Sequence, residues 1–274
     1  MKPALVSREP AAAAGARNAY EMRTLFRGLQ VLACFTPEQP ELTLTDIARR
    51  VGMPKGTVHR FVAALERHGY LVRGANGRGY ILGLRILALG HASLRGLRAP
   101  EIALPYLERL AQETDESASM AILDGTEIVY VARAQRKRLM STTLTVGSRL
   151  PVYCTSIGKV ILAFRDEAEV DALLDRIEFR RFTPYTITTR QELKKALGEV
   201  RRLGYAINNQ ELELALRSAA APIWSRGHQV VAGISLAMPV QRGPMSTLRR
   251  LFIPKLLQTA QEITDALRHV DIRW

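Results

Sequence analysis

The amino-acid sequence predicts an α+β fold in two domains, with helices and a β-hairpin near its start and a mainly antiparallel sheet with helices after it. Length is the first observation, because 274 residues exceed the size of an average domain. The second is helical apolar spacing within residues 22–68, and the third is a change to short strands after Pro100. We expect domains at residues 21–83 and 100–274, joined by a linker helix over residues 84–99.

Apart from its first residues, the composition is that of a globular protein. Hydrophobic residues make up 47% of the chain and charged residues 24%. Residues 1–20 lack apolar periodicity and a signal-peptide core, so a flexible tail is expected there. No run approaches the roughly 18 apolar residues of a membrane span, which predicts a soluble, cytoplasmic protein that makes no membrane contact. Cys34 and Cys154 match no metal or redox spacing and are interpreted as reduced core thiols.

Positive charge is concentrated near the start of the chain. The net charge is +13. Residues 1–98 hold 15 Lys and Arg against 6 Asp and Glu, a net of +9, and residues 99–274 hold 24 against 20, a net of +4. A basic domain favours binding to a phosphate backbone, because neutralised phosphates release counterions. An Arg-rich soluble surface explains the charge equally well on its own.

The N-terminal domain is expected to contain a helix-turn-helix. A first helix over residues 22–35 has a predicted buried face, formed by Leu25, Leu29, Leu32 and Ala33. A short helix capped by Thr43 or Thr45 ends at Gly52, and another begins at Pro54 with early polar and basic residues. The predicted DNA-binding residues of these two helices are Thr45, Lys55, Thr57, His59 and Arg60. An ordinary helical hairpin fits this pattern about equally well.

A predicted β-hairpin over residues 70–82 favours the first interpretation. Asn76-Gly77 is a strong hairpin signal, because both residues tolerate positive φ. Arg73 and Arg78 flank its tip, where guanidinium groups contact phosphate or the minor groove. Helices and a hairpin in this order predict a winged helix-turn-helix that binds double-stranded operator DNA.

The linker helix is expected to end at the Ala99-Pro100 step. Its apolar stripe is a candidate contact with a second copy of the chain. Such a homodimer would place two recognition helices on successive half-sites of a palindrome. His91 in this stripe is interpreted as a packed residue rather than a ligand.

The C-terminal domain is expected to be an α+β sandwich with a mainly antiparallel sheet. The predicted strands are residues 119–123, 127–132, 139–146, 205–208 and 229–237, and residues 246–269 predict a closing helix. Asp124-Gly125 joins the first two strands. Thr155 and Ser156 cap a helix whose first N–H groups suit a carboxylate. A plain capped helix is the simpler interpretation.

Taken together, these residues resemble the IclR family of bacterial regulators from about Arg23 to the C-terminal helix. The resemblance rests on residues 44–71, residues 150–163, and Gly204-Tyr205 through Ser218-Ala219-Ala220-Ala221-Pro222 to Gly233-Ile234-Ser235. Residues 144–156 and 209–213 are most similar to family members that regulate protocatechuate, 4-hydroxybenzoate and β-ketoadipate catabolism. The resemblance implies a winged helix-turn-helix dimer, often paired into tetramers, with a GAF-like effector domain that binds small organic acids.

The same resemblance implies an effector pocket. By position, its residues are Ser156, Ile157, Asn208, Ser218 and Ser235. Family members that bind small keto acids tend to have Asp, Cys and Ser where this chain has Asn208, Ser218 and Ala237. The loss of a charge and a hydroxyl makes this pocket less polar, so an aromatic or longer acid is expected. Asn209 departs from the acidic residue common among regulators of aromatic acids.

No catalytic residue, metal site or cofactor is expected. The histidines show no ligand spacing, and the sequence lacks a Gly-rich phosphate loop and a Gly-x-Ser-x-Gly elbow. Cys154 near a helix start lacks a local partner base, so an activated thiolate is disfavoured. Two alternatives to a regulator of aromatic-acid catabolism remain. They are an IclR-type regulator of small keto-acid metabolism and a protein that binds nucleic acid without sequence preference.

Overall fold

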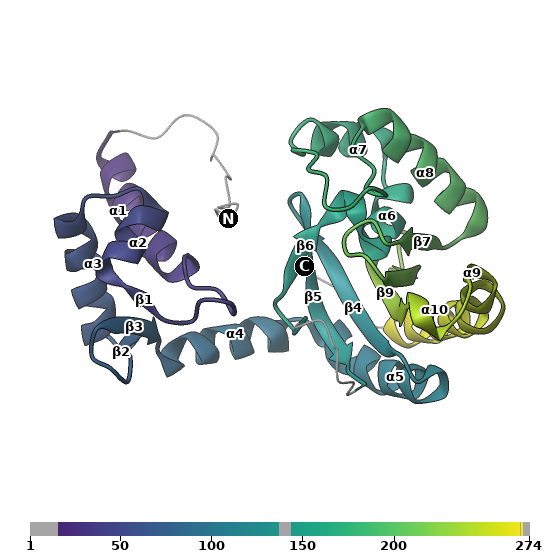
Figure 1. The fold of residues 1–274 in the computed structure, drawn as a ribbon, viewed down its shortest axis with the longest axis horizontal. Coiled ribbons are helices and arrows are strands. Elements are labelled where there is room, and N and C mark those ends of the chain that lie inside the picture. Colours follow the sequence, from purple (N-terminus) through teal and green to yellow (C-terminus); the bar gives the residue numbers. More distant parts are fainter. Residues whose placement is uncertain (1–15, 137–143, 269, 271–274) are drawn as a thin grey trace. The chain divides into compact units, whose positions relative to one another are not determined.

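The computed structural model describes residues 16–136, 144–268 and 270 (Figure 1). The chain divides into two compact units, Met1–Ser93 and Leu94–Trp274. Each unit encloses hydrophobic residues of its own. The architecture is α+β, as predicted.

The first unit packs helices against a small antiparallel sheet. Its elements are α1 (Ala16–Ala33), β1 (Leu42–Thr43), α2 (Leu44–Val51), α3 (Lys55–Arg67), β2 (Leu71–Arg73) and β3 (Gly79–Leu82). The strands are ordered β1-β3-β2. Ile47, Val58 and Leu71 are fully enclosed between the helices and the sheet. Burying these aliphatic side chains drives the association of helices too short to be stable alone.

The predicted buried face of α1 is wrong. Leu25 and Leu29 are 68% and 53% exposed, and Val31 is buried instead. The core of this unit includes Val31 and Leu32 from the C-terminal end of α1, and the earlier leucines lie outside it. The helix also begins at Ala16 rather than at residue 22, and so includes part of the expected tail. Residues 1–15 of that tail lie outside the described residues.

The turn between α2 and α3 has the expected geometry. Thr43, not Thr45, caps α2, because its hydroxyl accepts from the Asp46 N–H while the Asp46 carboxylate accepts from the Thr43 N–H. Gly52 ends α2 with φ of 65°. In the β2–β3 hairpin, Gly77 adopts positive φ and Asn76 does not. The hairpin predicted around Asn76-Gly77 is present, since β2 and β3 pair antiparallel.

The linker continues into the next helix after a short break. Helix α4 (Leu84–Gly96) is followed at once by α5 (Arg98–Thr114). The Ala99-Pro100 step thus lies in the first turn of α5, and the prediction that it ends the linker helix is wrong. Proline is tolerated there, because the first N–H groups of a helix have no partner within it.

The second unit contains an antiparallel sheet in the order β6-β5-β4-β9-β8-β7. Its strands are β4 (Ser117–Asp124), β5 (Glu127–Ala134), β6 (Arg149–Pro151), β7 (Ala206–Asn209), β8 (Leu216–Trp224) and β9 (Val230–Pro239). Helices cover both faces. On one face α5 and α10 (Ile253–Leu267) pack; on the other lie α6 (Ser156–Ala163), α7 (Glu167–Leu174) and α8 (Arg190–Leu203).

Three sequence expectations for this unit need correction. Strand β8 was not predicted, although it pairs with β7 and β9. Of the strand expected at residues 139–146, residues 139–143 lie outside the described residues, and residues 144–146 are not strand. The closing helix expected at residues 246–269 is present, but it is not α-helical throughout, because α9 (Met245–Thr247) passes through a π-helical turn, Leu248–Phe252, into α10. Pro254 in the first turn of α10 lacks an N–H, which accounts for an interrupted helix at this point.

No helix among the described residues is long and apolar enough to cross a membrane. The same residues contain no group of three or more His, Cys, Asp or Glu side chains that could hold a metal ion.

Close contact between α6 and the 3-10 turn before it, Val152–Cys154, depends on Gly158. A Cβ added there would collide with the Val152 carbonyl oxygen and approach the Thr155 hydroxyl. Gly158→Ala should therefore lower the free energy of unfolding by about 1–3 kcal/mol. Gly198→Ala is a matched control, because Gly198 lies exposed in α8 with open space around it, and should gain roughly 0.5–1 kcal/mol. Thermal unfolding of both variants tests this, and equal melting temperatures would contradict it.

Candidate functional site

The structure exposes most of the expected DNA-binding side chains at the start of α3. Lys55, His59 and Arg60 are exposed, and Thr57 is half-buried. Thr45 is exposed in the first turn of α2. Among the described ion pairs, none involves Lys55 or Arg60. Their charges are therefore free to meet a polyanion.

The two hairpin arginines differ in their surroundings. Arg73 Nε donates to Glu66 at 2.9 Å, and its guanidinium lies 4.4 Å from the centroid of the Tyr80 ring. Arg78 is exposed between β2 and β3. The two arginines were expected to be equivalent. In the structure, Arg73 contacts Glu66 and Tyr80, whereas Arg78 is exposed to solvent.

In the second unit, the start of α6 rests against β8 and β9. Thr155 is the N-cap residue, and its hydroxyl accepts from the Gly158 N–H at 3.1 Å. Sequence analysis named Thr155 and Ser156 together as caps. The structure separates their roles, because the Ser156 hydroxyl lies 2.8 Å from the Ser218 hydroxyl on β8. Next to it, Ile157 fills the space above Gly233 on β9.

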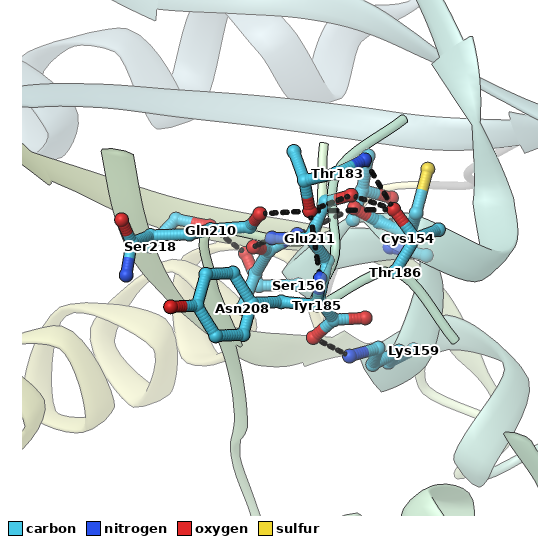
Figure 2. A network of polar contacts seen from close by, with 12 residues as sticks. Cys154, Ser156, Lys159, Thr183, Tyr185, Thr186, Asn208, Gln210, Glu211 and Ser218 are labelled. Carbon is cyan, nitrogen blue, oxygen red and sulfur yellow. Dashed lines mark hydrogen bonds and ion pairs between the residues drawn. The ribbon is translucent and has the colours of Figure 1, made fainter. Parts of the chain in front are cut away.

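Asn208 ties this helix start to β7 and the segment that follows it (Figure 2). Its amide nitrogen donates to the Cys154 carbonyl oxygen, and its amide oxygen accepts from the Glu211 N–H at 3.0 Å. Asn208 is opposite Ser218 in the β7–β8 register. A neutral amide serves here as both donor and acceptor, which an ionised Asp cannot do.

Ser235 completes the group on β9. It is opposite Ser119 on β4 and Ala220 on β8, and it is 6% exposed. Residues two apart on a strand share a face, so Ser235 lies on the face covered by α6. The structure thus brings all five residues expected from the family resemblance onto one side of the sheet: Ser156, Ile157, Asn208, Ser218 and Ser235.

A polar extension of this face, formed by Arg133 and Ser119, was not expected from the sequence. Arg133 on β5 is opposite Ser119, and its Nη1 donates to the Ser119 hydroxyl at 2.8 Å. Tyr130 on the same strand is buried, which raises the pKa of its phenol to about 12. Burial also lowers the pKa of Arg133. The available signal was an arginine directly after the apolar strand predicted at residues 127–132.

A buried ion pair lies beside the site. Lys159 on α6 meets Glu211, and their side chains are 4% and 9% exposed. The Glu211 carbonyl accepts from the Thr186 hydroxyl at 2.6 Å, and the Gln210 carbonyl accepts from Thr183 at 2.7 Å (Figure 2). The ion pair holds the segment after β7 against α6, and the threonine hydroxyls hold it to the stretch between α7 and α8.

Cys154 does not have the surroundings of a reactive thiol. It is fully buried, and burial raises the pKa of its thiol to about 12. At neutral pH the group stays protonated, and the thiol rather than the thiolate is a poor nucleophile. The geometry therefore supports the interpretation of Cys154 as a core residue.

Two family models match the chain. The IclR helix-turn-helix domain matches residues 24–75, and the C-terminal domain of bacterial IclR transcriptional regulators matches residues 91–265. Among curated proteins, the Pca regulon regulatory protein of Pseudomonas putida is 36% identical over 90% of this chain and 84% of its own length. The regulator XynR of Escherichia coli is 34% identical over 90% of this chain and 97% of its own.

Solved structures agree with these matches. A protein described as a transcriptional regulator from a Rhodococcus species has a TM-score of 0.80 and 40% identity over 91% of this chain and 99% of that one. An IclR homologue from Microbacterium hydrocarbonoxydans, solved with 4-hydroxybenzoate, has a TM-score of 0.76 and 31% identity over 89% and 98%. With both domain models matched, this chain belongs to the IclR family of bacterial transcriptional regulators, with a helix-turn-helix DNA-binding domain and a C-terminal effector domain.

Proposed function

We propose that this regulator controls genes of aromatic-acid catabolism in response to a protocatechuate, 4-hydroxybenzoate or β-ketoadipate type of acid. The observation that carries the proposal is the polar face beneath α6, where Ser156 meets Ser218 and Asn208 stands in place of a charged residue. Neutral hydroxyl and amide groups suit the hydroxyl or keto oxygens of such acids. The relatives that regulate Pca genes and the neighbour holding 4-hydroxybenzoate support the same class.

The proposed effector residues are Ser156, Ile157, Asn208, Ser218 and Ser235. The proposed DNA contacts are Thr45, Lys55, Thr57, His59, Arg60, Arg73 and Arg78. We propose that DNA binding resides in residues 21–83, effector binding in residues 100–274, and their connection in residues 84–99. A regulator of this kind acts where the DNA is, in the cytoplasm.

A homodimer or a dimer of dimers is part of the proposal. Apolar side chains stand exposed on α1 and α4, among them Leu25, Leu84 and Leu87, which are 68%, 85% and 70% exposed. Contiguous exposed apolar surface on helices marks an interaction site. Covering these stripes with a second copy would set the spacing of two recognition helices on operator half-sites.

The effector would act by shifting an equilibrium between two arrangements of the dimer. A ligand held between α6 and the sheet changes that equilibrium only to the extent that it binds one arrangement better. We propose that the linker helix transmits the difference to the recognition helices.

An IclR-type regulator of small keto-acid metabolism is the second candidate. The family membership shown by the two domain models leaves this candidate open. Asn208 and Ala237 disfavour this candidate, because they make the site less polar than in family members that bind small keto acids.

Arg60→Ala should weaken operator binding and leave effector binding intact. The operator is obtained by selecting duplexes from a random library with the protein itself. Loss of one recognition-helix contact should cost about 1–3 kcal/mol in operator binding, measured against a scrambled duplex by fluorescence anisotropy. Arg67→Ala is the control, because Arg67 is also exposed but lies in the last turn of α3. If selection enriches no sequence, binding without sequence preference is the better account.

Ligand-induced stabilisation should identify the effector class. A ligand that binds the native state raises the melting temperature by mass action. We expect a rise with protocatechuate, 4-hydroxybenzoate or β-ketoadipate and none with pyruvate or glyoxylate. A rise with only the last two acids would support the keto-acid candidate instead.

A further inference from the structure

Arg133 differs from its neighbouring arginines in lacking a partner for its charge. Arg149 pairs with Asp124 and Glu127, and Arg136 pairs with Asp115. Arg133 donates one hydrogen bond to the neutral Ser119 hydroxyl, its buried Nε has no partner, and no carboxylate of the described residues forms an ion pair with it.

An uncompensated guanidinium in such a place is costly. Arg133 is half-buried, with its Nε enclosed. A charge partly withdrawn from water without an opposite charge retains part of its desolvation penalty, and a hydrogen bond to a neutral hydroxyl recovers only some of it. Tyr130 on the same strand is buried and adds no negative charge, because its pKa lies far above neutrality. Within the described part of the chain, Arg133 therefore has no anion to compensate its charge.

We propose that Arg133 is the residue that binds the carboxylate of the effector, a role that rests on the proposed function. Arginine presents a planar fork of donors that matches a carboxylate. Ser119 holds that fork on the side of the sheet where Ser235 lies one strand away, on β9. This assigns the carboxylate to β5 and β4 rather than to the first N–H groups of α6.

The distance across the sheet then sets the shape of the ligand. The strands run in the order β4, β9 and β8, and Ser119 is level with Ala220 on β8, two residues from Ser218. Two strand spacings across the sheet and two residues along it separate Ser119 from Ser218 by roughly 12 Å. An acid bound at Arg133 reaches the Ser156 and Ser218 hydroxyls only if it is elongated and carries a polar group at its far end. A hydroxybenzoate or a six-carbon keto diacid has that form, whereas a two- or three-carbon keto acid does not.

The test removes the positive charge of Arg133 or the negative charge of the ligand. Full-length wild type, Arg133→Gln, Arg133→Lys and the control Arg136→Gln are titrated by calorimetry with 4-hydroxybenzoate and with its uncharged analogue 4-hydroxybenzamide. Arg136 is a matched control, because it is an exposed arginine on the same segment with a partner of its own. Binding of each variant to the selected operator duplex verifies that it is folded.

In wild type and Arg136→Gln, the acid should bind about 10- to 100-fold more tightly than the amide, as expected for a charge-assisted hydrogen bond. Arg133→Gln should bind both ligands with the weak affinity that wild type has for the amide. Arg133→Lys should keep part of the preference for the acid. If Arg133 had only a structural role, Arg133→Gln would weaken the binding of both ligands equally, and the ratio of the two affinities would stay the same.

The outcomes separate this inference from the function on which it rests. If wild type prefers the acid and Arg133→Gln keeps that preference, the carboxylate binds elsewhere and the assignment of Arg133 is wrong, although the proposed function stands. If wild type binds neither 4-hydroxybenzoate nor protocatechuate nor β-ketoadipate, the proposed function itself fails, and the role given to Arg133 fails with it.

Discussion

The close approach of α6 to the sheet is the constraint on which the rest of the effector domain depends. Gly233 on β9 lacks a side chain where it faces α6, and Ile157 occupies the space that Gly233 leaves. Gly158 lacks one where α6 meets the 3-10 turn of Val152–Cys154. Because the helix start lies so near the strands, the Ser156 hydroxyl reaches Ser218 and the Cys154 carbonyl reaches Asn208. A larger residue at Gly233 would move α6 away from the sheet and separate these polar groups.

The sequence predicted the elements with strong local signals. The winged helix-turn-helix was correctly placed, because capping residues, glycines with positive φ and an Asn-Gly turn specify its ends locally. Strand β8 was missed, since its buried run from Ala219 to Ile223 does not alternate between apolar and polar residues. The exposed leucines of α1 show a further limit: apolar spacing predicts that a face will be covered, but not whether its own chain covers it.

The candidate site could be predicted from the sequence only in part. Family resemblance located the five residues around α6, β7, β8 and β9, and the sheet register brings them to one face. It could not find Arg133, because its place beside Ser119 depends on an irregular register between β4 and β5 near Met120 and Ala121. A bulge turns later residues to the other face, and no local sequence signal marks it.

The Lys159–Glu211 pair limits how this domain can diverge. Replacing either residue alone would leave the other as an isolated buried charge, which is far more destabilising than the loss of the pair as a whole. A lineage can pass from an ionic to an apolar contact here only through a poorly folded intermediate or by two changes at once. Among descendants of this sequence, the two positions should therefore be retained or replaced together, even though they lie on separate segments of the chain.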